Sequence, residues 1–170
     1  GLETAQSIRQ SYEIATASSR IAHMGGSGGK GGDTSRSIGF QWTPEGLETL
    51  YLKSKVLIDV RSAGVPYPMS GGWFDIHDLE GLRALAVQLR QLGYTGMHLI
   101  HPSHIPVVNE VFSPTPEDVT HWQGLVNAME EMRSTGGAAI TFGGDMVDIA
   151  HEETARTMLA IAKEMGIEGA

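Results

Sequence analysis

DLEGLRALAVQLRQLGYTGMHLIHP, residues 78–102, contains one complete helix-to-strand unit of this chain. Asp78 opens an amphipathic helix, and Gly93 is a natural end for it. Apolar residues recur along this helix at nearly the helical period, at Leu82, Leu85, Ala86, Leu89 and Leu92. The apolar run Met97–Ile100 then predicts a short buried strand, with His98 in the core, that ends at His101 and Pro102. The stretch therefore predicts a helix packed against a buried strand.

Strand and helix alternate in the same way before and after this unit. Strands are predicted at residues 20–24 and 65–74, and helices at 7–18, 43–63 (with Thr43 as N-cap) and 105–112. Short connections with this alternation indicate βαβ units and a parallel sheet. A sheet of about three strands leaves edges and one face uncovered. We therefore predict that residues 1–112 form the later strands and helices of a larger (β/α)8 TIM barrel.

Residues 113–170 have a different pattern, which predicts a carboxy-terminal helix–hairpin–helix extension. A helix runs from Ser113–Asp118 to about Arg133. Two short apolar runs, 138–142 and 146–149, flank Gly143-Gly144-Asp145 and indicate a β-hairpin. An amphipathic helix from Glu152 to Met165 completes the extension.

Composition limits the classes of partner. Twelve basic against twenty acidic residues give a formal charge of −8, which argues against general nucleic-acid binding. Because this net charge repels an anionic substrate, such a substrate needs a local positive charge in its site, for example a bound divalent cation. The chain has no cysteine, no signal peptide, no initiating Met, and no apolar run near the ~20 residues that span a bilayer. These features lead us to expect a cytoplasmic enzyme with no membrane partner.

Candidate site residues lie where predicted strands end, because barrel enzymes place their chemistry at the carboxyl ends of strands. Glu3 precedes the first helix, Asp33 follows the strand ending at Met24, and His101 ends the strand 97–100. Two carboxylates from successive strand ends suit Mg²⁺. Each residue also has a structural alternative: a solvated carboxylate for Glu3, a cap for Asp33 and a strand-end residue for His101.

A glycine-rich tract, Gly25–Gly32, precedes Asp33. Its backbone N–H groups could approach a phosphate or carboxylate closely, although the tract is no Walker motif. A flexible surface loop is the alternative.

Taken together, the motifs resemble a known family. Glu3-Thr4-Ala5, Asp33 with Gly39, residues 75–82 (DIHDLEGL), residues 100–112 (IHPSHIPVVNEVF) and Met146-Val147-Asp148 occur in the order found in the HpcH/HpaI aldolase and citrate lyase beta-subunit family. The family includes malyl-CoA and citramalyl-CoA lyases. The resemblance covers nearly the whole chain.

The resemblance implies a Mg²⁺-dependent carbon–carbon lyase acting on the coenzyme A thioester of a hydroxy acid. It implies that Glu3 and Asp33 bind the metal and that Asp148, carried by a neighbouring subunit, serves as acid/base. It further implies substrate or coenzyme A contacts at Gly32, His101 and Pro102. The expected assembly is a homo-oligomer, a trimer or hexamer, in which the terminal hairpin reaches a neighbouring subunit.

Several positions depart from the family pattern. The glycine tract before Asp33 is longer than usual, Met97 replaces a common lysine, and His104 replaces the usual glutamine. The family's substrate-binding arginine and first strands lie upstream of Gly1.

Two other functions therefore stay open: a class II pyruvate-type aldolase acting on a free 2-keto acid, and a catalytically degenerate subunit. Half a barrel also leaves an apolar sheet interior without its partners, so we expect these 170 residues alone to associate or to be poorly soluble.

Overall fold

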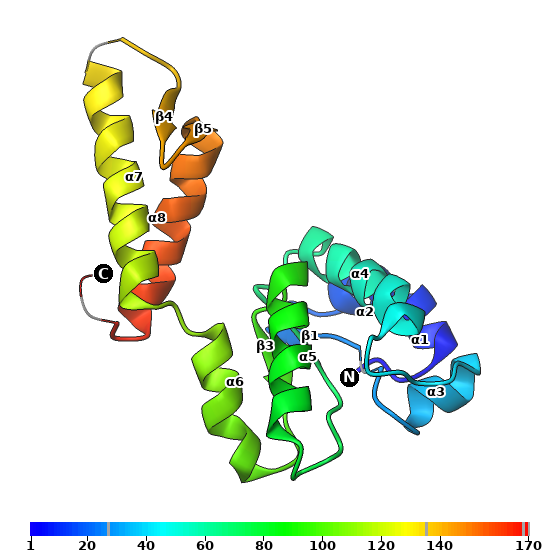
Figure 1. The fold of residues 1–170 in the computed structure, drawn as a ribbon. Helices are drawn as coiled ribbons and strands as arrows, with labels where there is room; N and C mark the ends of the chain where they lie inside the picture. Colours follow the sequence, from blue (N-terminus) through cyan, green and yellow to red (C-terminus); the bar gives the residue numbers. More distant parts are fainter. Residues whose placement is uncertain (27, 135, 168, 170) are drawn as a thin grey trace. The chain divides into compact units, whose positions relative to one another are not determined.

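The computed structural model describes residues 1–26, 28–134, 136–167 and 169 (Figure 1). Ser27 of the glycine tract lies outside the described residues. The chain divides into two compact units, an amino-terminal unit Gly1–Phe112 and a carboxy-terminal unit Ser113–Ala170. The whole is a helix-rich α/β structure with small sheets.

A parallel sheet forms the centre of the amino-terminal unit. Its strands are β1 (His23–Met24), β2 (Tyr67–Gly71) and β3 (Gly96–His98), in that spatial order. His23 pairs with Tyr67 and Met69 pairs with Gly96, both in parallel register. Leu2 extends the sheet through a parallel bridge to Gly26. The predicted parallel sheet is thus confirmed.

Helices connect and cover these strands. They are α1 (Ala5–Arg9), α2 (Ser11–Thr16), α3 (Asp33–Ile38), α4 (Leu47–Ser62), α5 (Leu79–Leu92), the 3-10 helix η1 (Pro102–His104) and α6 (Ile105–Phe112). The helix predicted at residues 7–18 is divided at Gln10, and α3 was not predicted.

Thr43 is not the N-cap of α4, so that prediction was wrong. The helix begins at Leu47 after Gly46. Thr43 instead donates from its backbone N and its Oγ1 to the Glu48 carboxylate, at 2.8 and 2.9 Å. Because Glu48 lies inside the first turn, this contact holds the segment before the helix in an irregular conformation.

The helix α5 has the predicted structure. The Asp78 carboxylate accepts a hydrogen bond from the Gly81 N–H at 2.9 Å, and Gly93 ends the helix in a left-handed conformation with φ of 109°. Leu82 and Leu89 are completely buried. They belong to one apolar cluster with Met97 of β3, while α2, α4 and β1 contribute to a second cluster.

The two faces of the sheet differ. Met24, Ser70 and Met97 are buried on the face that the helices cover, whereas His23, Tyr67 and His98 are exposed. His98 is therefore not a core residue, which corrects the expectation from its apolar strand. Partial burial lowers the pKa of His98, and the neighbouring His23 acts in the same direction.

The carboxy-terminal unit consists of α7 (Pro116–Ser134), the antiparallel strands β4 (Ile140–Phe142) and β5 (Asp145–Val147), and α8 (Ile149–Glu164). Figure 1 shows α7 and α8 side by side with the hairpin at one end. Gly143 and Gly144 turn the hairpin with φ values of 61° and 97°. The last helix begins at Ile149, before the predicted Glu152, so Asp148 is the helix cap and not part of the strand.

No helix in the described part of the chain combines the length and apolar character that crossing a membrane requires.

Candidate active site

The carboxyl ends of all the parallel segments meet at one edge of the amino-terminal sheet. Glu3 follows Leu2 there, the glycine tract follows β1, residues 72–78 follow β2, and His101 follows β3. We call this edge, with these four segments, the carboxyl edge. Open parallel sheets and barrels bind their ligands at such an edge.

The beginning of α1 fixes the backbone beside Glu3. Thr4 caps this helix, and its Oγ1 accepts from the Ser7 N–H at 3.0 Å while the Ser7 side chain contacts the Thr4 backbone N at the same distance. Glu3 itself is exposed. Its carboxylate thus projects from a fixed backbone into solvent.

Asp33 is the first residue of α3, and its carboxylate is 55% exposed. It forms an ion pair with the Arg36 guanidinium at 2.8 Å, and the Arg36 side chain is 81% exposed. Within α3, Ser37 accepts a hydrogen bond from the Ala5 backbone N at 2.9 Å. This bond ties α3 to the beginning of α1, so the structure brings the Glu3 and Asp33 segments together at the carboxyl edge.

No cluster of three or more His, Asp or Glu side chains suited to a metal occurs among the described residues. The carboxyl edge carries two exposed carboxylates, one on Glu3 and one on Asp33. Mg²⁺ is commonly held by one or two protein carboxylates together with substrate and water oxygens.

The first glycines of the tract are close-packed. A Cβ at Gly25 would lie 1.4 Å from the Met69 carbonyl oxygen, and a Cβ at Gly29 would lie 2.3 Å from the Phe74 ring. A Cβ at Gly31, by contrast, would meet nothing within 4 Å. This part of the tract is thus packed against the segment that contains β2 and the residues after it, which argues against a wholly flexible surface loop.

His101 caps the helix η1 at the end of β3. Its Nδ1 accepts from the Ser103 backbone N at 3.2 Å, and Pro102 occupies the first turn. With Nδ1 as acceptor, a neutral His101 carries its proton on Nε2. The structural role of His101 is therefore shown, and its contact with substrate stays a prediction.

His104 is fully buried, with its ring 6.1 Å from that of His101. Both of its ring nitrogens lack a hydrogen-bond partner within the described part of the chain. Leaving a buried polar group unsatisfied costs about 1–3 kcal/mol. Histidine in place of the usual glutamine at position 104 thus puts an imidazole with unsatisfied ring nitrogens next to the ring of His101. Met97, the other departure, has its side chain in the apolar core.

Asp148 lies in the carboxy-terminal unit, as N-cap of α8. Its Oδ1 accepts from the Ala150 N–H at 3.0 Å and lies 2.7 Å from His151 Nδ1. The hydrogen bond with the His151 side chain, followed by those with the His151 and Ala150 backbones, holds the pKa of Asp148 below its usual value. Asp148 is therefore an ionised carboxylate of fixed orientation.

A small hollow of about 10 Å³ beneath the glycine tract is lined in part by Lys53, a residue for which the sequence predicted no role. Lys53 of α4 is buried there beside Gly26 and Gly28, and its Nζ donates to Gln88 Oε1 at 3.3 Å. Burial lowers the pKa of Lys53, with Glu48 acting in the opposite direction. Lys53 could not be recognised from the residue pattern, because it lies between Leu52 and Val56 in an ordinary helix.

Comparison with known proteins identifies the family. The model of the HpcH/HpaI aldolase/citrate lyase family matches residues 1–102. This chain of 170 residues therefore belongs to the HpcH/HpaI aldolase/citrate lyase family.

Two relatives illustrate the range within the family. The citrate lyase subunit beta of Escherichia coli is 30% identical over 166 residues, which is 98% of this chain and 54% of that protein. The human mitochondrial citramalyl-CoA lyase is 32% identical over 132 residues, which is 78% of this chain and 38% of that protein. The chain thus spans about half the length of the curated relatives it matches or less.

Among solved structures, the protein CitE of Mycobacterium tuberculosis, in complex with magnesium, acetoacetate and coenzyme A, is similar. The TM-score is 0.72 at 26% identity, over 94% of this chain and 58% of that one.

Proposed function

We propose that the full-length protein is a magnesium-dependent carbon–carbon lyase that acts on the coenzyme A thioester of a hydroxy acid, such as malyl-, citramalyl- or citryl-coenzyme A. The observation that carries this proposal is the pairing of the Glu3 and Asp33 segments at the carboxyl edge of a parallel sheet. Membership of the citrate lyase family, and the similar CitE protein solved with magnesium and coenzyme A, support the class of reaction.

Glu3 and Asp33 suit Mg²⁺ as ligands. Both are exposed carboxylates, and hard oxygen ligands are those that Mg²⁺ takes. To bind a cation, Asp33 has to release Arg36, and an ion pair this exposed contributes little stability. When bound, Mg²⁺ supplies Lewis-acid stabilisation for the negative charge of the enolate.

Asp148 carries the proton in our proposal. It is held ionised by its cap hydrogen bonds, so it begins as a base. In the condensation direction the carbon next to the thioester loses a proton to this carboxylate. In the cleavage direction the ionised carboxylate takes the proton of the substrate's hydroxyl group as the carbon–carbon bond breaks, and it then gives this proton to the carbon next to the thioester. We assign Asp148 to a site on a neighbouring subunit of a homo-oligomer, a trimer or hexamer.

We further propose that the amino-terminal unit is the later part of a (β/α)8 barrel. The parallel order of Leu2, β1, β2 and β3, with helices on one face and exposed His23, Tyr67 and His98 on the other, supports this architecture. At the rim of that barrel, Gly32, His101 and Pro102 line the substrate site.

A titration of the full-length protein with Mg²⁺ tests the metal assignment. Asp33→Ala should weaken Mg²⁺ binding by on the order of tenfold or more, since even outer partners of metal ligands contribute that much. Glu80→Ala, which removes an exposed carboxylate from α5, is the matched control and should bind normally. Unchanged affinity in the Asp33 variant would exclude this residue from the site.

A substrate panel tests the reaction. We expect turnover of malyl-, citramalyl- or citryl-coenzyme A, with loss of activity in Asp148→Asn. Turnover of free 4-hydroxy-2-oxo acids that is independent of Asp148 would instead identify a pyruvate-type aldolase. Normal Mg²⁺ binding without turnover of any member of the panel would identify a degenerate subunit.

A further inference from the structure

The carboxylate of Asp148 has a side-chain partner three residues further along the chain, the imidazole of His151 in α8. Three nitrogen atoms lie close to one oxygen of the carboxylate, Oδ1: the Ala150 backbone N at 3.0 Å, the His151 backbone N at 3.4 Å and His151 Nδ1 at 2.7 Å. The second oxygen, Oδ2, has no hydrogen-bond partner in the part of the chain that the structure describes. The two oxygens of this carboxylate are therefore not equivalent.

The ring nitrogen His151 Nδ1 lies near two groups of Asp148 and can serve only one of them at a time. As an acceptor it would take the hydrogen bond of the Asp148 backbone N–H at 3.3 Å, which is the usual arrangement of a capping box. As a donor it would give its hydrogen bond to Oδ1 at 2.7 Å. An ionised oxygen and a nitrogen lone pair repel each other at this distance, whereas a charge-assisted N–H···O bond has about this length. The shorter contact therefore places a proton on Nδ1.

We infer that His151 is a positioning residue for Asp148, because its Nδ1–H binds Oδ1 and leaves Oδ2 as the oxygen that exchanges the proton with the substrate. This inference rests on the proposed function, in which Asp148 is the acid/base. Protonation of Oδ1 would disturb three contacts, whereas protonation of Oδ2 disturbs none of them. In the cleavage direction the hydroxyl proton thus goes to Oδ2 and from there to the carbon next to the thioester. The proton on Nδ1 stays on the ring throughout.

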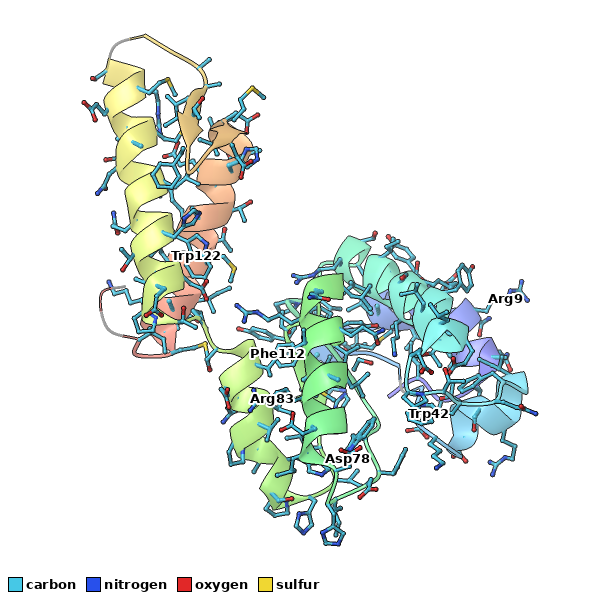
Figure 2. All side chains as sticks on the ribbon, viewed as in Figure 1. Arg9, Trp42, Asp78, Arg83, Phe112 and Trp122 are labelled. Carbon is cyan, nitrogen blue, oxygen red and sulfur yellow. The ribbon has the colours of Figure 1, made fainter. Side chains whose placement is uncertain are left out.

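The surroundings of His151 leave its ring in contact with water. The side chain is 53% exposed and lines two open hollows, of about 310 and 430 Å³. Trp122 of α7, which is labelled in Figure 2, lines the smaller hollow. The other titratable groups on these hollows are His121 of α7 and Asp145 of β5. Neither has a hydrogen bond or ion pair with Asp148 within the described ranges of the chain, so His151 is the titratable side chain that binds this carboxylate.

The pKa of Asp148 agrees with this arrangement. The hydrogen bond with the His151 side chain lowers this pKa most, and desolvation acts in the opposite direction. The next acidic residue of α8, Glu152, is paired with Arg133 and Arg156, so these two cations are already bound. Removal of the donor at position 151 should therefore raise the pKa of Asp148.

Nitrogen NMR of the full-length protein with isotope-labelled histidine tests the hydrogen bond without any substrate. At a pH where the imidazole is neutral, we expect His151 to carry its proton on Nδ1, and to lose this preference in Asp148→Ala. A wild-type ring with its proton on Nε2 would show that Nδ1 accepts from the Asp148 backbone, and it would overturn the inference.

Two substitutions at position 151 separate positioning from helix capping. His151→Glu keeps an acceptor for the Asp148 backbone N–H, as glutamate does in the common capping box, but offers no donor to Oδ1. This variant should unfold near the wild-type temperature. Its kcat should be roughly tenfold lower with little change in KM, because the carboxylate loses its fixed orientation. The acidic limb of its pH profile should move to higher pH, because a like charge raises the pKa of Asp148.

His151→Gln keeps a donor for Oδ1 and should retain most of the wild-type kcat. The matched control is His121→Leu, which removes the other imidazole from the same two hollows and whose ring contacts Phe142. It should have the kcat, KM and pH profile of the wild type. The assay uses whichever of malyl-, citramalyl- and citryl-coenzyme A the wild type turns over fastest.

The outcomes separate this inference from the proposed function. If His151→Glu had the wild-type kcat and pH profile while Asp148→Asn was inactive, His151 would be a helix cap alone and the lyase proposal would stand. Equal losses of kcat in His151→Glu and His151→Gln, with no movement of the acidic limb, would likewise overturn the positioning role. Absence of thioester turnover in the unmodified protein would overturn the two proposals together.

Discussion

The two units hold their acidic side chains in opposite ways. In the amino-terminal unit, Glu3 is exposed and Asp33 has a loose surface ion pair with Arg36. In the carboxy-terminal unit, Asp148 is tied into a helix cap, and Glu152 is buried between Arg133 and Arg156. A metal ligand has to exchange one partner for another, whereas a proton carrier needs a fixed direction and a set pKa. The difference matches the separate roles we propose for Asp33 and Asp148.

The largest expected effect separates these roles. Asp148→Asn should lower kcat about 10²- to 10⁴-fold, the range for loss of a general acid/base, while Mg²⁺ affinity stays the same. Asp33→Asn should raise the Mg²⁺ concentration required for activity. Steady-state kinetics across a magnesium series measures both. If Asp148→Asn shifted the magnesium requirement, the division of roles would be wrong.

The next effect concerns the packing that supports the amino-terminal unit. Leu82 is completely buried between α5 and the sheet, so Leu82→Ala should lower the free energy of unfolding by about 2–5 kcal/mol. Leu47→Ala, at a position 77% exposed, should change it by less than about 0.5 kcal/mol. Chemical denaturation compares the two variants. Equal losses would contradict the assigned core.

A smaller effect is expected at the hairpin that precedes Asp148. Gly144 has φ of 97°, so Gly144→Ala should destabilise the hairpin by about 1–2 kcal/mol, while Gly144→Asn should cost less. Amide exchange in β4 and β5 reports the change. Protection that is the same in both variants would show that the turn conformation does not limit the hairpin.

The smallest effect at neutral pH concerns Glu152. Hydrogen bonds from Arg156 and Arg133 hold its pKa below the usual value in the folded protein. Its contribution to stability is therefore complete above the pKa of an unfolded glutamate and decreases as pH falls through the lower, folded value. Glu152→Gln should lower the unfolding temperature at pH 7, and this difference should shrink below about pH 4.3. A difference that is constant with pH would exclude this linkage.

The sequence alone predicted the regular elements in which the capping residues and the apolar period agree with the packing in the folded structure. The helix α5 has its cap at Asp78, its apolar period and its terminal Gly93, and all three lie where the pattern predicts. The helix α4 begins later than predicted because the Glu48 carboxylate competes for Thr43. Such a competition depends on side-chain geometry that a residue pattern does not contain.

The site shows the same limit. Strand ends correctly predicted that Glu3 and Asp33 follow parallel segments of one sheet. The contacts of Trp42 with Trp73 and with Lys30 could not be predicted, because the three residues come from connecting segments with no shared period. His98 was misassigned because an apolar strand was taken to be covered on both faces, whereas the helices cover only one.

The glycine tract has a consequence for how the protein can change. At Gly25 and Gly29 any larger residue collides with the segment of β2 and the residues after it, so a substitution there requires a second, compensating one in that segment. At Gly32 the nearest atom to a Cβ would be a backbone oxygen at 3.8 Å, and the φ of −81° suits any residue. The glycine tract therefore contains two kinds of position. A substitution at Gly25 or Gly29 depends on a second substitution, whereas a substitution at Gly32 does not. A library of variants selected for folding alone, and not for activity, should recover single replacements at Gly32 and only paired replacements at Gly25 and Gly29.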